Sequence, residues 1–209
     1  FYERLDFVAS SYVTRQQQWL RKNIVDYIVA HAPPLNGRCT VMHVRRADVV
    51  LHKRVGRRYY PVSDYVDRLP LERRAKGSTI LLLTDDQNAI DEALEFYPDI
   101  RWQYFQRKRY RGTEGGWESQ IPSGSPRLEV IIMLSTFQVV KQCDFLVHGK
   151  SGFARALYAS MAATGKPVRT IDISGKNPFD TKNVMTDVDL ASLLDKRRQQ
   201  DKFKTFTPT

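Results

Sequence analysis

The chain has 209 residues, of which 42% are hydrophobic and 27% charged, a balance that excludes a wholly disordered protein and fits about one sizeable domain. No run approaches the roughly 18 apolar residues that a membrane-spanning helix needs. Lys and Arg total 33 against 23 Asp and Glu, a net charge of +10 that suits an anionic partner such as nucleic acid, acidic lipid or a phosphorylated small molecule. Because the first residue is Phe1 and nothing there resembles a signal peptide, we expect a piece of a longer protein.

Apolar spacing and turn residues predict an alternation of helices and short strands along the chain. In chain order we expect a helix over 16–31, a strand over 39–44, a helix over 61–69, a strand over 79–84, a helix over 87–96, a strand over 100–105 and a long loop over 106–126. After that loop we expect a buried helix, apolar nearly all round, over 128–140, a strand over 144–148, a helix over 153–163, a strand over 168–172 and a terminal helix over 189–198.

Strands that alternate with helices in this way form βαβ units, so the predicted fold class is α/β with a parallel sheet and helices on both of its faces. The continuous apolar run over 79–84 is typical of a strand buried on both faces. We assign the sheet domain to residues 1–178 and a C-terminal helix and tail to 179–209. Sheets of this kind bind ligands at the carboxyl ends of their strands, near the point where the strand order reverses.

Three polar clusters directly follow predicted strands. They are His-Val-Arg-Arg-Ala-Asp at 43–48, Thr-Asp-Asp at 84–86 and His-Gly-Lys-Ser-Gly at 148–152. Since parallel strands end at one edge of the sheet, we expect the three clusters to converge on one crevice.

The adjacent arginines of the first cluster point to opposite sides, so only one of Arg45 and Arg46 is expected to face a ligand. A guanidinium there can grip a phosphate through two hydrogen bonds. The other arginine would then pair with Asp48 or with a carboxylate after the next strand. Two solvated surface arginines are the alternative interpretation.

The other clusters allow more than one interpretation. Asp85 and Asp86 suit a ribose hydroxyl, a metal or an arginine, and either can cap the following helix. Ser151 and the helix start after it suit a phosphate, although a plain strand-to-helix turn explains the same residues. An ATPase-type phosphate loop is excluded, because the glycine that it requires is replaced by Asp144.

The histidines and cysteines carry weaker signals. His43 lies within a predicted strand, where packing is the usual role, whereas His52 lies in a basic loop and is more available. Cys39 and Cys143 each lie in an apolar run and are expected to be buried free thiols, with a disulfide as the alternative. No His/Cys spacing typical of zinc is present.

A series of motifs from about residue 8 to 175 resembles the C-terminal, nucleotide-sugar-binding half of the α-1,6-fucosyltransferases. The most specific motifs are His43-Val-Arg-Arg-Ala-Asp48 and Asp144-Phe-Leu-Val147. Weaker ones are Thr14-Arg-Gln-Gln-Gln-Trp-Leu20, Pro61 with Tyr65, Thr84-Asp-Asp86, and Ser151 with Arg155.

The resemblance implies a Rossmann-like domain, the C-terminal half of a GT-B-like glycosyltransferase that transfers fucose from GDP-fucose to a glycan or glycoprotein acceptor with inversion. It implies no metal and no cofactor beyond the donor, a Golgi or secretory-pathway location, and an N-terminal region upstream of this chain. It assigns the phosphate contact to Arg45 with Arg46 beside it, the guanine edge to His43, ordering of the site to Asp85 or Asp86, and the β-phosphate to Ser151.

Two departures from the family pattern lead to alternatives. Val49 stands where the family members that fucosylate the core of N-glycans have a lysine. The segment 49–60 also contains no counterpart of the glutamate that activates the acceptor in those enzymes, so Asp48 or His52 would replace that base. The family's guanine-binding aspartate is also missing from 128–140, where Glu129 is a possible substitute. The alternative is a catalytically silent module that binds a nucleotide sugar or glycan, and a nucleic-acid-binding domain has only the net charge and the basic segment at 106–111 in its favour.

Overall fold

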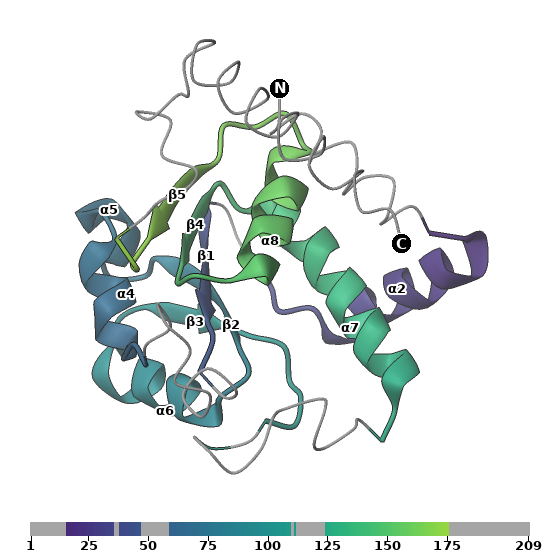
Figure 1. The fold of residues 1–209 in the computed structure, drawn as a ribbon, viewed down its shortest axis with the longest axis horizontal. Coiled ribbons are helices and arrows are strands. Elements are labelled where there is room, and N and C mark those ends of the chain that lie inside the picture. Colours follow the sequence, from purple (N-terminus) through teal and green to yellow (C-terminus); the bar gives the residue numbers. More distant parts are fainter. Residues whose placement is uncertain (1–15, 36–37, 47–58, 110, 112–123, 176–209) are drawn as a thin grey trace, which may run out of the picture. The chain divides into compact units, whose positions relative to one another are not determined.

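A computed structural model of the chain describes residues 16–35, 38–46, 59–109, 111 and 124–175 (Figure 1). The described elements, in chain order, are α2 (Gln18–His31), β1 (Cys39–Val44), α4 (Val62–Arg68), α5 (Leu71–Arg74), β2 (Thr79–Thr84), α6 (Gln87–Phe96), β3 (Arg101–Gln103), α7 (Pro126–Val139), the 3-10 helix η1 (Val140–Gln142), β4 (Phe145–His148), α8 (Gly152–Ala162) and β5 (Arg169–Asp172). In this part of the chain, no helix combines the length and the apolar character that crossing a membrane requires.

The five strands form one sheet in the order β3-β2-β1-β4-β5, and every neighbouring pair is parallel. From β1 the chain adds β2 and β3 on one side, and it then crosses back to add β4 and β5 on the other. The strand order therefore reverses between β1 and β4, at the centre of the sheet. This architecture confirms the predicted α/β class with a Rossmann-like parallel sheet.

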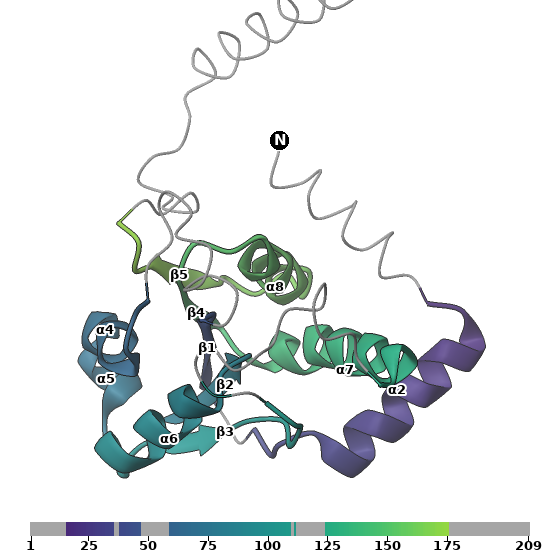
Figure 2. The ribbon, with the colours of Figure 1, turned by 60° about the horizontal axis from the view of Figure 1, so that its bottom comes forward.

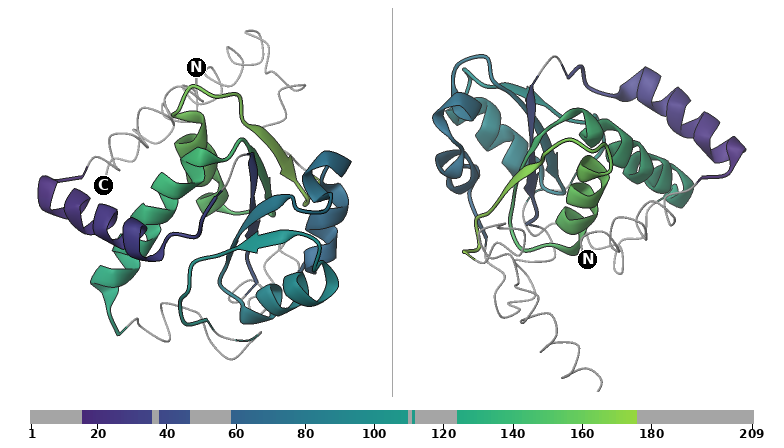
Figure 3. Two further views of the ribbon diagram at one scale, coloured as in Figure 1. Left: turned by 180° about the vertical axis from the view of Figure 1, so that it is seen from behind. Right: turned by 90° about the horizontal axis from the view of Figure 1, so that it is seen from above.

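Helices cover both faces of the sheet (Figure 2). Alternate residues of β1 explain why two cores form: Met42 and Val44 pack with α4 and α6, whereas Cys39 and Val41 pack with α2, α7 and α8. Strand β2 divides its side chains between the same two cores. Helix α2 lies alongside α7 in the second layer (Figure 3).

The structure differs from the predicted elements at a few points. The short helix α5 was not predicted, and β3 is shorter than the strand expected over 100–105. Helix α7, expected to be a buried helix, is buried only in part, because Leu128, Val130 and Met133 are exposed on its outer surface. The terminal helix expected over 189–198 and the boundary expected at residue 178 lie outside the described residues and stay predictions.

The two cysteines form a disulfide, so the expectation of free thiols is wrong. Cys39 begins β1, and Cys143 follows η1 and lies two residues before β4. Both are buried at the amino-terminal edge of the sheet, where Asp144 N donates to Cys39 O and brings the two segments together. A cysteine in an apolar run of sequence is usually a buried free thiol. Here the two apolar runs lead into neighbouring strands, so the two buried cysteines form a disulfide instead.

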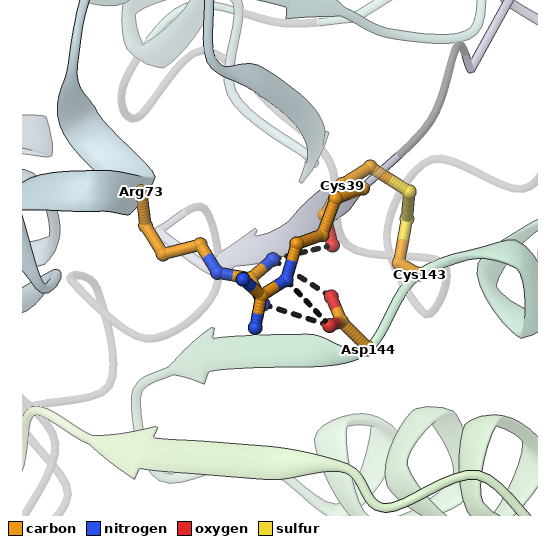
Figure 4. Close-up of a disulfide and its surroundings, with 5 residues drawn as sticks. Cys39, Arg73, Cys143 and Asp144 are labelled. Carbon is orange, nitrogen blue, oxygen red and sulfur yellow. Dashed lines mark hydrogen bonds and ion pairs between the residues drawn. A yellow bond between two sulfur atoms is a disulfide. The ribbon is translucent and has the colours of Figure 1, made fainter.

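An ion-pair cluster lies beside the disulfide (Figure 4). Arg73 from α5 donates two hydrogen bonds to the Asp144 carboxylate, at 2.7 and 2.8 Å, and Arg38 donates a third at 3.0 Å. Arg73 is almost fully buried. Hydrogen bonds from Arg73, and then from Arg38, lower the pKa of Asp144 to about 2 despite its partial burial. The disulfide and this cluster together join β1, β4 and α5.

Replacing both cysteines (Cys39→Ala with Cys143→Ala) should lower the free energy of unfolding by about 2–5 kcal/mol, because the cross-link restricts a long loop of the unfolded chain. The two cysteines are 104 residues apart in the sequence. Urea unfolding followed by far-ultraviolet circular dichroism measures the difference. Parent protein unfolded in the presence of a reductant serves as the control and should match the double variant. Equal stability of the parent and the double variant under oxidising conditions would contradict the prediction.

Replacing Asp144 with Asn should destabilise the fold by about 3 kcal/mol at pH 7, because the Arg73 guanidinium loses its charged partner in a buried place. The folded-state pKa of Asp144 is depressed, so its contribution is complete above pH 4 and is lost as the pH falls toward 2. The stability difference between parent and variant should shrink over that window. Asp99→Asn is the control, since Asp99 pairs with Lys76 at an exposed position and should change stability little.

Candidate functional site

The described residues of the three predicted polar clusters come together at the carboxyl-terminal edge of the sheet. Strand β1 lies between β2 and β4, and the register pairs Val44 with Thr84 and His43 with His148. The ends of β2, β1 and β4 therefore lie next to one another. The strand order reverses between β1 and β4, within this group. This confirms the prediction that the clusters share one edge.

Arg46 is the most buried charged side chain of this edge, with no exposed surface. Its guanidinium donates to both carboxylate oxygens of Glu92 on α6 at 2.7 Å, to Asp86 at 3.3 Å and to the carbonyl of Tyr60 at 3.0 Å. It also lies 4.3 Å from the centre of the Tyr59 ring. The prediction that one arginine pairs with a carboxylate after the next strand is confirmed by the contact with Asp86.

The electrostatics of this pair follow from burial and charge. Burial lowers the pKa of Arg46, but the hydrogen bonds and negative charge of Glu92 more than offset it, and the net pKa is raised. For Glu92, burial raises the pKa and the hydrogen bond from Arg46 lowers it, with a net lowering. Both groups are thus held in their charged forms. A guanidinium enclosed in this way presents no surface to a ligand, so the structure revises the assignment of Arg46 to the donor-binding residues.

Arg45, in contrast, is exposed. The backbone on either side of it is fixed, since Val44 ends the β1 ladder and Arg46 N donates to Asp85 Oδ1 at 3.0 Å. Of the two adjacent arginines, Arg45 is therefore the one that is exposed at this edge.

Asp85 and Asp86 have different roles. Asp85 accepts the hydrogen bond from the backbone of Arg46 and so ties the ends of β2 and β1 together. Asp86 is the N-cap of α6, where its carboxylate accepts from Asn88 N at 3.1 Å, and it also pairs with Arg46. The helix-capping interpretation is confirmed for Asp86.

His43 and His148 lie side by side on β1 and β4. His43 is buried and its ring packs against Phe153 of α8, with 5.4 Å between ring centres. Burial, then His148 and Arg45, lower the pKa of His43 to about 3, so its imidazole is neutral at physiological pH. Within the described part of the chain, His43 Nδ1 has no hydrogen-bond partner, which is rare for a buried polar atom. Burial also lowers the pKa of His148, whose Nδ1 lies 2.8 Å from Gly149 O.

Ser151 begins the helix that follows β4. Its Oγ accepts from Phe153 N at 3.2 Å and so forms the N-cap of α8. An accepting hydroxyl keeps its own proton available for donation. The preceding turn is packed closely onto α4, because a Cβ on Gly149 would lie only 3.2 Å from the Tyr65 hydroxyl.

Two predicted site residues, Asp48 and His52, lie outside the described residues, so their roles stay predictions. Two described arginines of the basic segment at 106–111 contact the rest of the domain: Arg109 donates to the carbonyls of Thr84 and Phe105, and Arg111 pairs with Asp91. Arg107 forms an ion pair with Glu129, the possible substitute for the guanine-binding aspartate. These internal pairings remove much of the support for a nucleic-acid-binding surface.

Sequence reasoning missed Glu92. It lies six residues after Asp86 in an amphipathic helix with several acidic residues, where a solvated position is the ordinary expectation. Only its contact with Arg46, which comes from the segment directly after β1, distinguishes Glu92 from the other acidic residues of α6. Across the described ranges, no group of three or more His, Cys, Asp or Glu side chains is arranged to hold a metal ion.

Comparison with known proteins yields distant structural matches. No family model matches the chain, and no curated protein matches it. Among solved structures, a NodZ α-1,6-fucosyltransferase soaked with GDP-fucose matches with 16% identity and a TM-score of 0.37, covering 69% of this chain and 42% of that one. POFUT1 matches in its apo form and in complex with GDP-fucose, each with 11% identity and a TM-score of 0.35, covering 75% and 76% of this chain and 47% and 46% of those chains. This chain thus spans less than half the length of these fucosyltransferases, and the likeness is remote enough that function has to be argued from the chain's own residues.

Proposed function

We propose that this chain is the donor-binding half of a glycosyltransferase that uses a nucleoside diphosphate sugar. GDP-fucose is the proposed donor, and a glycan or glycoprotein is the proposed acceptor. The observation that carries the proposal is the presentation of one exposed guanidinium, that of Arg45, at the edge where β1, β2 and β4 end. The other arginine of the pair is enclosed by carboxylates. The resemblance of the motifs at 43–48 and 144–147 to those of the α-1,6-fucosyltransferases supports fucose as the transferred sugar.

The chemistry requires charge neutralisation at the leaving group. As the bond between the fucose anomeric carbon and the β-phosphate oxygen breaks, negative charge develops on GDP, and a fixed cation stabilises it without a metal ion. Arg45 would donate to the diphosphate. The Ser151 hydroxyl at the N-terminus of α8 would add a second contact, where the helix dipole also favours an anion.

Base recognition would fall to His43. Its buried, neutral imidazole has an Nδ1 with no partner among the described residues, and a guanine edge would supply one. The acceptor hydroxyl would attack the anomeric carbon from the face opposite the leaving GDP, which inverts the configuration. Its proton would pass to Asp48 or His52, the two residues that the sequence offers for that role.

The disulfide supports a secretory-pathway location. Disulfides persist in oxidising compartments and are rare in the cytosol, where thiols are kept reduced. We therefore propose that the chain folds in such a compartment, in keeping with a glycan or glycoprotein acceptor.

Replacing Arg45 with Ala should weaken GDP binding by roughly 10- to 100-fold, the value of a charge-assisted hydrogen bond, and donor turnover should fall at least as far. Calorimetric titration with GDP and GDP-fucose, and an assay of donor hydrolysis or transfer, measure the two effects. Arg68→Ala is the matched control, because Arg68 is an exposed arginine at the C-terminal end of α4, the opposite end of that helix from Val62, which contacts Glu92.

Three outcomes separate the candidate functions. Undiminished GDP binding in Arg45→Ala would overturn the assignment. Tight GDP binding by the parent without any turnover would favour the silent binding module. Binding of RNA or DNA that weakens steeply with salt, without GDP binding, would favour the nucleic-acid alternative.

A further inference from the structure

Two chemically identical side chains at adjacent positions differ in exposure: the Arg45 guanidinium faces outward, whereas that of Arg46 is buried. Arg45 and Arg46 have the same side chain and adjacent positions. The alternation of β1 directs Arg46 to the side of Met42 and Val44, where α4 and α6 pack. Whether its guanidinium stays buried there depends on the partners that this side supplies.

Glu92 is the centre of that set of partners. Its two carboxylate oxygens accept four hydrogen bonds, two from the Arg46 guanidinium, one from the Tyr59 hydroxyl at 2.9 Å and one from Val62 N at 3.0 Å. We call Arg46 and Glu92, with these contacts, the clasp. It joins the end of β1, the middle of α6 and the start of α4.

Burial of a guanidinium is unfavourable unless a charged partner with suitable geometry accepts its hydrogen bonds. Glu92 provides the two-point contact, and Asp86 lies farther away at 3.3 Å. Without the Glu92 charge, the burial of Arg46 would lose most of its compensation. The Arg46 side chain would then be more stable in solvent than buried. Because its contacts also fix the backbone at 45–46, that backbone would no longer be held in one orientation.

We propose that Arg46 and Glu92 are positioning residues that select Arg45 as the guanidinium presented to the donor diphosphate. The inference deepens the proposed function and rests on it for the identity of the anion. The selection itself is a property of the protein alone, so it can be measured without any ligand.

The first measurement is arginine-selective modification by phenylglyoxal, mapped by tandem mass spectrometry. In the parent chain Arg45 should react and Arg46 should be protected. In Glu92→Gln, which keeps the size of the side chain and removes its charge, Arg46 should become reactive. Glu95→Gln is the matched control, since Glu95 is an exposed glutamate of the same helix and the replacement should leave the pattern unchanged. Continued protection of Arg46 in Glu92→Gln would overturn the proposal.

The second measurement is GDP affinity in a double-mutant cycle. Glu92→Gln alone should weaken GDP binding about tenfold, and it should add little in the Arg45→Ala background, because the two changes act on one contact. Affinities are measured well below the melting temperature of each variant. A drop in thermal stability with unchanged GDP affinity would show a merely structural ion pair and would overturn the positioning role.

The two measurements keep the proposals distinct. If the parent does not bind GDP, the donor-binding proposal fails, while the modification pattern still decides whether the clasp selects between the arginines. If Glu92→Gln does not fold, Glu92→Asp keeps the charge but shortens the two-point contact, and it should give an intermediate reactivity of Arg46. Parental protection of Arg46 in a folded Glu92→Asp variant would count against selection by that contact.

Discussion

The parallel pairing of β1 with β2 on one side and β4 on the other is the constraint on which every candidate residue depends. It places the ends of three strands side by side and sets His43 against His148. It also brings Cys39 and Cys143 together at the opposite edge. Chain segments that are about 40 to 105 residues apart in the sequence thus become neighbours through one central strand.

The charged and titratable side chains at the carboxyl edge differ in burial and in the partners that they have. A parallel sheet covered by helices on both faces leaves little room for ionised groups, so each one near the core needs partners. Arg46 has Glu92 and Asp86, whereas His43 is neutral. Arg45, the other arginine of the pair, is exposed beside them.

Much of this arrangement follows from patterns in the sequence. The strands at 39–44 and 79–84 and the helix at 87–96 have the predicted bounds, because continuous β-branched or aliphatic runs and a capping aspartate are strong local signals. The shared edge follows from the order of the elements alone.

The remaining features depend on contacts that local patterns do not encode. The disulfide requires the amino ends of β1 and β4 to be adjacent, and two cysteines in apolar runs are equally compatible with free thiols. The difference between Arg45 and Arg46 requires Glu92, one of three acidic residues in an amphipathic helix, and nothing in the local pattern separates it from Asp91 and Glu95. The exposed side of α7 likewise depends on which of its flanks meets another helix.

The disulfide and the Arg73–Asp144 contact have a consequence for how such a domain can change over evolutionary time. They anchor β1, β4 and α5 at the edge remote from the candidate site. Substitutions in the turns at the other edge then act on a framework whose strand register is covalently secured. A scaffold of this kind tolerates substitutions in those turns, so ligand specificity can change without loss of the sheet that supports it.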